Sequence, residues 1–498
     1  MDKRLLAGLD IGTTGCKVSV FSPEGECLGS AYRAYPAQRS LTVHEMDADV
    51  LWAAVQEVLC EAAGQFDGIA AVGVASFGES FVALDAQDAV LMPVMLNTDP
   101  RGSSQCRRLA ETLGREKLIR ITGVNPHHTY SLPKLMWIRE HRPDTYARIR
   151  RVLLMEDYVV YRLTGCAQID YSLAARTMAF DIHRLCWSEE VLRAAEVDPG
   201  LFSAPVPTGT AAGAIRGIPG LEGALAVSIS HDQVAAAVGS GVLDESRTVD
   251  GAGTVQCCTP VFCQYDAMKM ARNQFCVVPF LDGGRYVTYA YSYTGGALVK
   301  WFCDNLAGNA RQEAARRQSD IYSVLEDGWD GTPTGILVLP HFAGAATPYM
   351  DDGSQGAIVG LTLSHTQEDL YRAILEGVCF EMRLNQERLM ESGVRLSPLY
   401  ATGGGAKSRV WMQMKADILN VPVTSLRTSE AGASGSAMLA GIAAGVFPSL
   451  EAAAAVMVRE KETFLPRQNI HAQYEEIYQR YRRLYDAVRP LCKEREQC

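Results

Sequence analysis

Residues 4–21 read "RLLAGLDIGTTGCKVSVF": an apolar run that ends at Asp10, a Gly-Thr-Thr-Gly turn and an alternating run. The apolar run is typical of a buried strand, and the alternation in residues 17–21 is typical of a second strand. Glycine at both ends of the turn at 12–15 allows the backbone to reverse sharply. Another extended run follows at residues 27–35. The segment therefore predicts an antiparallel β-meander.

The turn between the first two strands is also a candidate phosphate site. Successive backbone N–H groups in a glycine-rich turn can bind an anion, and Gly12 allows a ligand to approach closely. The hydroxyl groups of Thr13 and Thr14 add donors, and Lys17 adds positive charge. Asp10 would repel phosphate directly but could hold Mg²⁺ through water. The alternative interpretation is a tight hairpin without a ligand.

Helical and strand patterns alternate along the first half of the chain. Residues 46–63 have helical periodicity, with Asp47 or Asp49 as the N-cap, and residues 69–76 and 223–230 are apolar strands. This alternation predicts an α/β fold.

The chain begins a similar pattern again near residue 247. The segment "RTVDGAGTVQCCTPVF" (247–262) also has an Asp and a Gly-Thr turn between extended runs, although one extra residue separates Asp250 from its Gly-Thr pair. Such a repeat is the sign of a duplicated lobe. We therefore predict two domains, residues 1–246 and 247–498.

Two glycine-led helix starts in the second half are further candidate ligand sites. "ATGGGAKSRVWMQMKADIL" (401–419) has three glycines before a helix that begins near Ser408, and "YTGGALVKWF" (293–302) has a glycine pair. Helix N-termini with small residues accept phosphate groups. The chain has no GxxxxGK[ST] loop, no GxGxxG between strand and helix, and no GxSxG elbow. A nucleotide site would therefore use the hairpins.

The segment "VSISHDQ" (227–233) places an acid where a buried strand meets a helix. Ser230 and Gln233 fit a capping box, which would place Asp232 in the first turn with a lowered pKa. The structural alternative is that Asp232 only complements the helix dipole.

Asp232 is one of several polar residues at strand ends. Asp10 follows the first strand, and "FGES" (77–80) follows the strand at 69–76. The carboxyl ends of strands in open α/β sheets are where ligands bind. We therefore expect these segments to converge on a site.

Composition excludes several classes of protein. The 498 residues carry a net charge of −10, which argues against a nucleic-acid binder. The N-terminus does not have the pattern of a signal peptide, and the apolar residues 433–447 are too few to span a bilayer, so we expect a closely packed helix there. The 14 cysteines contain no CxxC pair, which favours reduced thiols and a cytoplasmic location.

In chain order, these motifs resemble those of the FGGY carbohydrate kinases, particularly the xylulokinase-like members. The resemblance covers nearly the whole chain. Its segments are "GLDIGTTGCK" (8–17), "LNTDPR" (96–101), residues 133–165, "SISHDQVAAAVGSG" (228–241), "GAGT" (251–254), residues 344–383, residues 401–419 and residues 430–447.

The resemblance implies an α/β fold of two actin-like (ribonuclease H-like) lobes, with the active site in the cleft between them and ATP and Mg²⁺ as cofactors. It implies a sugar-binding lobe in residues 1–246 and a nucleotide-binding lobe in 247–498. Asp232 would be the general base and Asp10 would organise the metal. The residues implied to contact ATP lie in the glycine-rich segments: Gly12, Thr13, Thr14, Lys17, Gly253, Thr254, Gly296, Gly403, Gly404, Gly405 and Ser408.

The sugar side departs from the family pattern. Gly78 and Glu79 replace the Met-His pair of xylulokinases, and only the acid matches the Arg-Glu pair of glycerol kinases. Asn97 occupies the position of a Trp, two residues before Asp99. With Asp232, these are the predicted substrate-binding residues. Losing an aromatic wall predicts a wider and more polar pocket.

The resulting hypothesis is transfer of the ATP γ-phosphoryl group to a hydroxyl of a xylulose-like ketose. The alternative within the family is a polyol or sugar acid such as glycerol, erythritol or gluconate. A catalytically silent sugar sensor and an actin-like ATPase, such as a chaperone or filament, are the other classes. The family also makes a homodimer a reasonable expectation; we expect no nucleic-acid or membrane partner.

Overall fold

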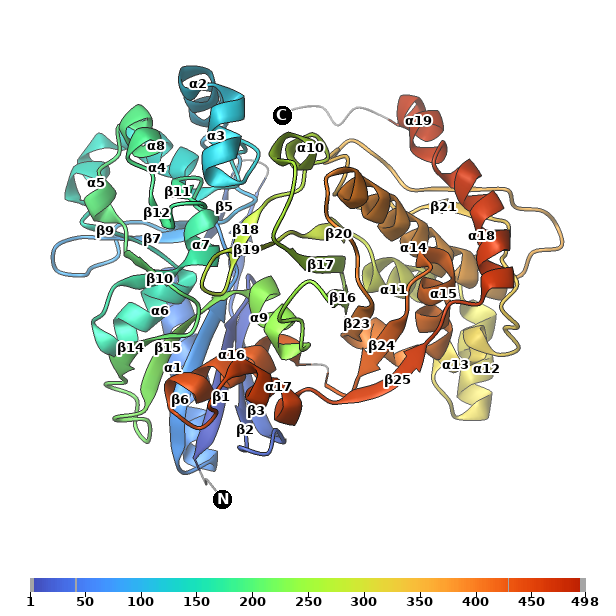
Figure 1. The fold of residues 1–498 in the computed structure, drawn as a ribbon, viewed down its shortest axis with the longest axis horizontal. Coiled ribbons are helices and arrows are strands. Elements are labelled where there is room, and N and C mark those ends of the chain that lie inside the picture. Colours follow the sequence, from blue (N-terminus) through green and yellow to red (C-terminus); the bar gives the residue numbers. More distant parts are fainter. Residues whose placement is uncertain (1–3, 41–42, 429, 493–498) are drawn as a thin grey trace. The chain divides into compact units, whose positions relative to one another are not determined.

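The computed structural model describes residues 4–40, 43–428 and 430–492 and divides the chain into two compact units (Figure 1). Unit 1 comprises Met1–Leu243, Cys276–Val287 and Glu430–Val458; unit 2 comprises Asp244–Phe275, Thr288–Ser429 and Arg459–Cys498. The first segment ends close to the boundary predicted at 246, and two later segments return to unit 1.

Unit 1 is built on a six-stranded sheet. β1, β2 and β3 form the predicted antiparallel meander, β6 and β15 continue the sheet parallel to β1, and β14 closes it antiparallel. Their order in the sheet is β14 (Thr210–Ala214), β15 (Leu225–His231), β6 (Ile69–Ser76), β1 (Leu5–Ile11), β2 (Gly15–Phe21) and β3 (Cys27–Ala34).

The sheet of unit 2 repeats this topology. β16 and β17 form an antiparallel hairpin, β20 pairs with β17, β23 and β24 run parallel to β16, and β25 closes the sheet antiparallel. Their bounds are β16 (Thr248–Ala252), β17 (Gln256–Phe262), β20 (Ala290–Ser292), β23 (Leu399–Thr402), β24 (Val423–Leu426) and β25 (Glu460–Phe464). The predicted duplication is thus confirmed at the level of topology.

The remaining elements complete the two units. Those of unit 1 are α2 (Ser103–Leu113), α3 (Arg115–Thr122), α4 (Ser131–His141), α5 (Pro143–Arg148), α6 (Met155–Thr164), α7 (Tyr171–Ala175), α8 (Glu189–Ala195), α9 (Asp232–Gly239), α17 (Leu450–Met457), β4 (Ala37–Arg39), β5 (His44–Met46), β7 (Phe81–Leu84), β8 (Val94–Met95), β9 (Arg151–Leu154), β10 (Gln168–Asp170), β11 (Phe180–Asp181), β12 (Cys186–Trp187), β13 (Ala204–Val206), β18 (Val278–Phe280) and β19 (Arg285–Val287). Those of unit 2 are α10 (Ala267–Arg272), α11 (Gly296–Asn305), α12 (Gly308–Arg317), α13 (Ile321–Glu326), α14 (Gln367–Glu391), α15 (Arg409–Leu419), α18 (Gln468–Tyr481), α19 (Leu484–Val488), β21 (Leu337–Leu339) and β22 (Ala357–Val359). Across the described ranges, none of these helices has the length and apolarity needed to cross a membrane.

One face of the unit 1 sheet packs against the predicted helix, α1 (Ala48–Gln65). Its N-cap is Asp47, whose carboxylate accepts from the backbone N–H groups of Asp49 and Val50. Alternate residues of β1, including Leu9, join the core formed with this helix. The residues between them point to the opposite face.

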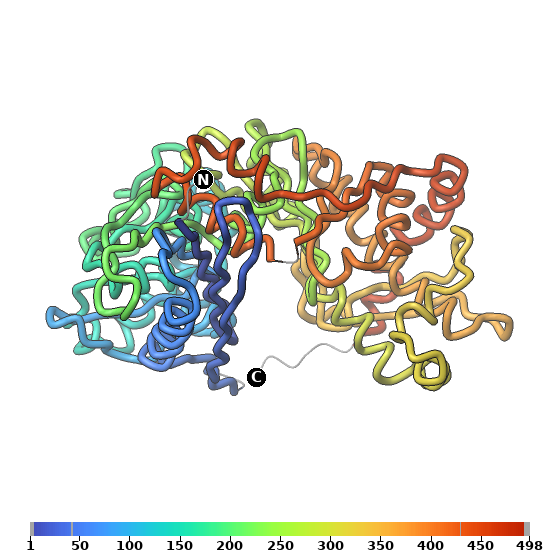
Figure 2. The backbone as a smooth tube through the Cα atoms, turned by 90° about the horizontal axis from the view of Figure 1, so that it is seen from below, coloured from blue at the N-terminus to red at the C-terminus, as the bar shows by residue number. Residues whose placement is uncertain are grey.

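The opposite face packs against α16 (Ala431–Ala443) at main-chain distance. A Cβ added to Gly8 would lie 2.0 Å from the carbonyl oxygen of Ala433, and one added to Gly73 would lie 2.4 Å from that of Ser436. In Figure 2 the orange-red tube of this helix lies beside the blue N-terminal strands. The closely packed helix predicted from residues 433–447 is confirmed.

Helix α16 makes the same kind of contact with α9. A Cβ on Gly435 would lie 2.0 Å from the carbonyl oxygen of Ala235, and one on Gly239 would lie 1.9 Å from that of Ala431. Real Cβ atoms do not approach oxygen so closely, so any side chain here must push the two helices apart.

We predict that Gly435→Ala lowers the free energy of unfolding by about 1–3 kcal/mol, because the added methyl group overpacks this contact. The matched control is Gly64→Ala in α1, where an added Cβ meets nothing within 4 Å. That change should be neutral or stabilising by up to about 1 kcal/mol. Denaturant unfolding of both variants measures the difference; equal stabilities would contradict the packing argument.

Candidate functional site

The hairpin between β1 and β2 has a fixed shape. Gly12 N–H donates to the carbonyl of Gly15 at 2.9 Å, and the hydroxyl of Tyr35 donates to the carbonyl of Gly12 at 2.5 Å. The N–H of Tyr35 also donates to the carbonyl of Thr14 at 3.1 Å. Main-chain carbonyls of the turn are therefore held by protein donors, while Thr13 is only half-buried. This arrangement suits a turn that presents N–H and hydroxyl donors to an anion.

Asp10 lies at the end of β1 beside this turn, on the face that α16 covers. A Cβ on Gly432 would be 3.9 Å from its Oδ2 atom. Burial raises the pKa of Asp10 to about 7, and the negative charges of Asp232 and Glu430 raise it further, against the opposing effect of Lys17. Lys17 pairs with Glu430 at 2.8 Å. The site thus gathers acids whose mutual repulsion a bound cation would relieve.

These residues fit a Mg²⁺ ion held mainly through water and ligand oxygens. A carboxylate oxygen is the ligand that Mg²⁺ prefers, and the ion commonly keeps several waters and binds one or two carboxylates. Within the described ranges, no group of three or more His, Cys, Asp or Glu side chains forms a closed metal site. Asp10 is accordingly suited to an ion whose coordination sphere is open and partly filled by water.

Asp232 begins α9, directly after β15 ends at His231. The predicted capping box is wrong: Ser230 lies within β15 and its hydroxyl donates to the carbonyl of His231 at 3.0 Å, while the N-cap residue is His231. The expected position of Asp232 in the first turn is confirmed. Ser230 does not cap the helix because β15 continues through His231, so α9 begins one residue later than the capping box requires.

The predicted direction of the Asp232 pKa shift is also wrong. Burial raises this pKa to about 6, and Glu79 raises it further; the N–H and side chain of Gln233 and the charge of Arg176 act in the opposite direction. The side chain nevertheless keeps 36% of its surface exposed. Desolvation therefore outweighs the helix dipole, and the carboxyl becomes a stronger base than an ordinary Asp.

His231 does not neutralise Asp232. Its Nδ1 atom lies 3.1 Å from Oδ1 of Asp232, but burial lowers the pKa of the imidazole to about 3, so the ring is neutral near pH 7. Asp232 keeps its full charge when ionised.

Gly78 and Glu79 lie beside Asp232, as predicted for the ends of neighbouring strands. Glu79 has a left-handed backbone (φ 69°), its carbonyl accepts from the hydroxyl of Ser131 at 2.6 Å, and its carboxylate accepts from Nε of Arg176 at 2.6 Å. A Cβ on Gly78 would lie 3.0 Å from Cγ of Arg176 and 3.1 Å from Cδ2 of His231. A side chain at position 78 would therefore press on the Arg176 side chain that reaches Glu79.

Sequence reasoning missed Arg176. It follows the short helix α7 in the apolar run "SLAARTMAF" (172–180), which matches no motif. An arginine in such a run is itself a signal, because a cation among buried residues requires an acidic partner.

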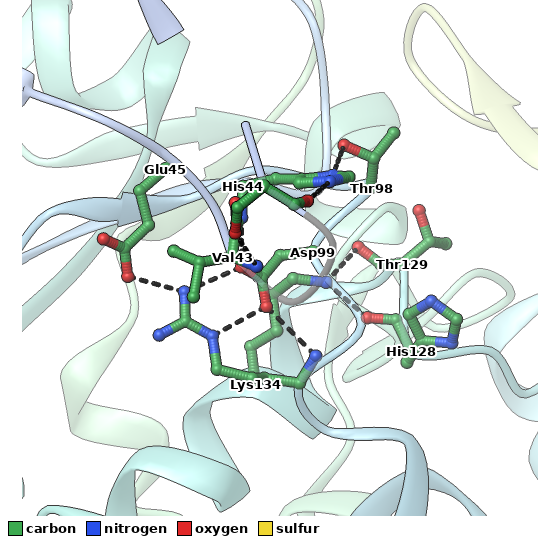
Figure 3. Close-up of polar contacts among 10 residues, drawn as sticks. Val43, His44, Glu45, Thr98, Asp99, His128, Thr129 and Lys134 are labelled. Atoms are coloured by element: carbon green, nitrogen blue, oxygen red, sulfur yellow. Dashed lines mark hydrogen bonds and ion pairs between the residues drawn. The ribbon is translucent and has the colours of Figure 1, made fainter. Parts of the chain in front are cut away.

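Asp99 belongs to a separate polar cluster, drawn in Figure 3. Its carboxylate accepts from the N–H of His44 at 2.8 Å and from Nε of Arg101 at 2.7 Å, and Arg101 also pairs with Glu45 at 2.6 Å. Burial raises the pKa of Asp99, but the Arg101 side chain and the backbone donors outweigh it, so the net shift is downward. These bonds hold the loop that contains the half-buried Asn97.

Lys134 of α4 is a second residue that sequence reasoning missed. It is fully buried, and its Nζ atom donates to the carbonyls of His128 and, at 3.2 Å, Thr129 (Figure 3). Burial lowers the pKa of this ammonium group to about 8, while the charges of Asp99 and Glu79 oppose the shift. Lys134 therefore links the two acidic residues electrostatically.

The three glycine-rich segments of unit 2 converge. Gly296 N–H at the start of α11 donates to the carbonyl of Gly253 at 2.8 Å. A Cβ on Gly403 would lie 2.8 Å from the carbonyl oxygen of Ala252, and one on Gly405 would lie 3.0 Å from the Cβ of Ala252. Next to them, Gly404 has open space and Thr254 is exposed.

The predicted start of α15 is confirmed. The hydroxyl of Ser408 caps the helix by accepting from the N–H of Trp411 at 2.9 Å, and it donates to Oε1 of Glu326 at 2.7 Å.

The two hairpins differ in which groups surround the carboxylates of Asp10 and Asp250. Asp250 precedes the Gly-Thr turn of unit 2, one residue further from it than Asp10 is from its own turn, and its fully buried carboxylate accepts hydrogen bonds from Lys415 and Gln256. The charge of Asp250 is thus neutralised within the protein, whereas Asp10 faces other acids. Only the hairpin of unit 1 keeps an acid suited to a cation.

We predict that Asp10→Asn stabilises the chain at pH 8 in the presence of EDTA, by on the order of 4 kcal/mol. The folded pKa of about 7 lies above the ordinary value of 3.8, so the ionised acid destabilises the fold. This cost is absent below about pH 4, grows towards pH 7 and is constant above it. Denaturant unfolding across this range measures it, and Mg²⁺ should stabilise the parent more than the variant.

The matched control is Asp250→Asn, which leaves Lys415 buried without its acid and should destabilise by about 3–5 kcal/mol at both ends of the range. A parent protein and an Asp10→Asn variant with the same pH dependence would contradict the electrostatic argument.

Comparison with known proteins now identifies the family. The model of the FGGY carbohydrate kinase N-terminal domain matches residues 5–239, and that of the C-terminal domain matches residues 271–444. The chain is 28% identical to a xylulose kinase from Bacillus subtilis (strain 168), over 98% of both chains, and 28% identical to a glycerol kinase from Janthinobacterium sp. (strain Marseille), over 90% of this chain and 92% of the relative.

Among solved structures, the gluconate kinase from Lactobacillus acidophilus superposes with a TM-score of 0.87 at 21% identity, covering 98% of this chain and 99% of that one. This likeness shows the fold, and it confirms the predicted α/β class with two actin-like units. The chain therefore belongs to the FGGY family of carbohydrate kinases and is a sugar kinase, a phosphotransferase with an alcohol group as acceptor.

Proposed function

We propose that this kinase transfers the γ-phosphoryl group of ATP to a hydroxyl of a xylulose-like ketose, with Asp232 as the general base. The observation that carries the proposal is the position of Asp232 at the junction of β15 and α9, where burial within the protein raises its pKa to about 6. A base in this range is largely ionised at pH 7.5 yet binds a proton better than an ordinary Asp.

Asp232 would accept the proton of the attacking hydroxyl late in the transfer. Phosphoryl transfer passes through a loose transition state, so positioning and charge neutralisation contribute more than basicity. The charge of Asp232 also acts on Asp10 of the phosphate hairpin, which supports a common site for base and phosphate.

In this proposal each unit contributes one phosphate hairpin. Gly12, Thr13, Thr14 and Lys17 of unit 1 and Gly253 and Thr254 of unit 2 would contact phosphates. Gly296, Gly403, Gly404, Gly405 and Ser408 would line the nucleotide; the convergence of their segments in unit 2 supports this. Mg²⁺, held near Asp10, would neutralise charge on the phosphate oxygens when bound.

The proposed acceptor residues are Gly78, Glu79, Asn97, Asp99 and Asp232. Glu79 and Asp232 would contact the sugar, whereas Asp99 would act mainly by holding the loop of Asn97, because protein donors already occupy its carboxylate. The xylulose kinase relative favours a ketose. A polyol is the second candidate, supported by the glycerol kinase relative and by the acid at position 79.

We also propose a cellular location and an oligomeric state for the enzyme. The described cysteines are all free thiols, several of them exposed, which supports a reducing cytoplasm. A homodimer stays a prediction from the family.

A coupled ADP-release screen over pentuloses, hexuloses, polyols and aldonic acids tests the function. We expect strongly sugar-dependent ADP release, with a ketose as the best acceptor. Sugar-independent ATP hydrolysis would instead indicate an ATPase, and no turnover with any acceptor would indicate a sensor.

We predict that Asp232→Asn lowers kcat by ~10²–10⁴, or about 3–5 kcal/mol of barrier, with a smaller effect on KM for the sugar. The amide keeps the shape of the side chain but cannot take the proton. Steady-state kinetics with the best acceptor measures the loss; near-normal turnover would rule out the assignment of the base.

We predict that Gly403→Ala raises KM for ATP about tenfold or more and leaves KM for the sugar unchanged. Gly403 has φ +91°, and its Cβ would press on the carbonyl of Ala252 in the hairpin. The control is Gly393→Ala after α14, which has φ +89° but only ordinary contacts. It should lose stability without changing either KM; the same effect in both variants would show that strain alone is responsible.

A further inference from the structure

The ion pair between Arg176 and Glu79 is unusually buried for charged side chains. The two side chains are only 13% and 5% exposed; Arg176 directly follows α7, and Glu79 lies in the loop between β6 and β7. Removing two charges from water is costly, and an apolar pair of the same size is often at least as stable. The pair is therefore poorly explained by stability alone.

The surroundings of this pair place it at the proposed acceptor site. The guanidinium carbon of Arg176 lies 5.2 Å from the centroid of the Tyr130 ring, and the Arg176 side chain fills the space left by Gly78, beside His231. His231 is followed directly by Asp232. Glu79 and Arg176 also act in opposite directions on the pKa of Asp232.

We propose that the Arg176–Glu79 pair determines acceptor specificity, binding adjacent oxygen atoms of a neutral polyhydroxy acceptor and rejecting acceptors that carry a carboxylate. This inference rests on the proposed function. Glu79 would accept a hydrogen bond from one hydroxyl, and Arg176 would donate to a neighbouring hydroxyl or carbonyl oxygen.

The charges of this region support the proposed rejection of acceptors that carry a carboxylate. Glu79 neutralises Arg176, while Asp99 and Glu45 neutralise Arg101. Lys134 directs its Nζ atom to main-chain carbonyls. In the part of the region that the structure describes, the cations are thus engaged by the protein, and the ionised Asp232 would repel a carboxylate.

Matched acceptors test this selectivity in the parent enzyme. The pairs are D-gluconate with D-glucitol, and D-xylonate with D-xylulose and xylitol. Within each set we expect kcat/KM for the neutral compound to exceed that for the acid at least 100-fold. A preference for the acid would overturn the inference and leave the kinase function intact, whereas no turnover with any acceptor would count against the proposed function itself.

Glu79→Gln reports on the charge of the pair. The amide keeps a hydrogen-bonding group but leaves the charge of Arg176 without its acid, so the ratio of kcat/KM for the acid to that for the neutral compound should rise at least tenfold. An unchanged ratio would overturn the proposal.

The double variant Arg176→Met, Glu79→Met separates specificity from folding. Arg176→Met alone leaves Glu79 buried without its cation and should lower Tm. The double variant removes both charges and should recover Tm, yet KM for the neutral acceptor should stay raised at least tenfold with a smaller change in kcat. Recovery of both Tm and KM would show that the pair is only structural.

Arg383→Met is the matched control. Arg383 of unit 2 is 12% exposed, pairs with Glu475 and lies 4.2 Å from the centroid of the Tyr478 ring, so it resembles Arg176 in burial and contacts. Its loss should lower Tm while KM for the acceptor stays unchanged. A rise in that KM equal to the rise in Arg176→Met would also overturn the proposal.

Discussion

The contact of α16 with β1, β6 and α9 at main-chain distance is the constraint on which the site in unit 1 depends. Asp10 lies two residues after Gly8, and Asp232 begins the helix that ends at Gly239. Both glycines touch α16, so the same helix fixes Asp10, the proposed metal-side acid, and Asp232, the proposed base. Since α16 comes from residues 431–443, most of the residues of unit 2 lie in the sequence between the strands of the unit 1 sheet and the helix that packs on it.

The two sheets show how one topology can carry different chemistry. Both hairpins have an acid before a Gly-Thr turn, yet Lys415 neutralises Asp250, while Asp10 faces Asp232 and Glu430. A phosphate group would meet a neutral hairpin in unit 2 and an acidic one in unit 1. The acid that repels phosphate is then the one that a cation can bridge to the phosphate. The two hairpins would therefore bind phosphate in different ways.

Local patterns predicted the elements of this fold well, and tertiary contacts explain what they missed. The meander, the repeated hairpin and the start of α15 depend on neighbours in sequence, and all are confirmed. The cap and the pKa assigned in "VSISHDQ" were wrong because tertiary contacts, which the heptapeptide does not encode, extend β15 through His231 and desolvate Asp232. Arg176 was missed because its partner lies 97 residues away.

Glu79 connects base strength with acceptor choice. Its charge raises the pKa of Asp232 and also neutralises Arg176, so the two properties cannot be varied separately at this position. A neutral residue at 79 would weaken the base and expose a cation to the acceptor in one step. Replacing Arg176 and Glu79 together would avoid the stability cost of a single replacement, because either charge left alone would be buried without its partner.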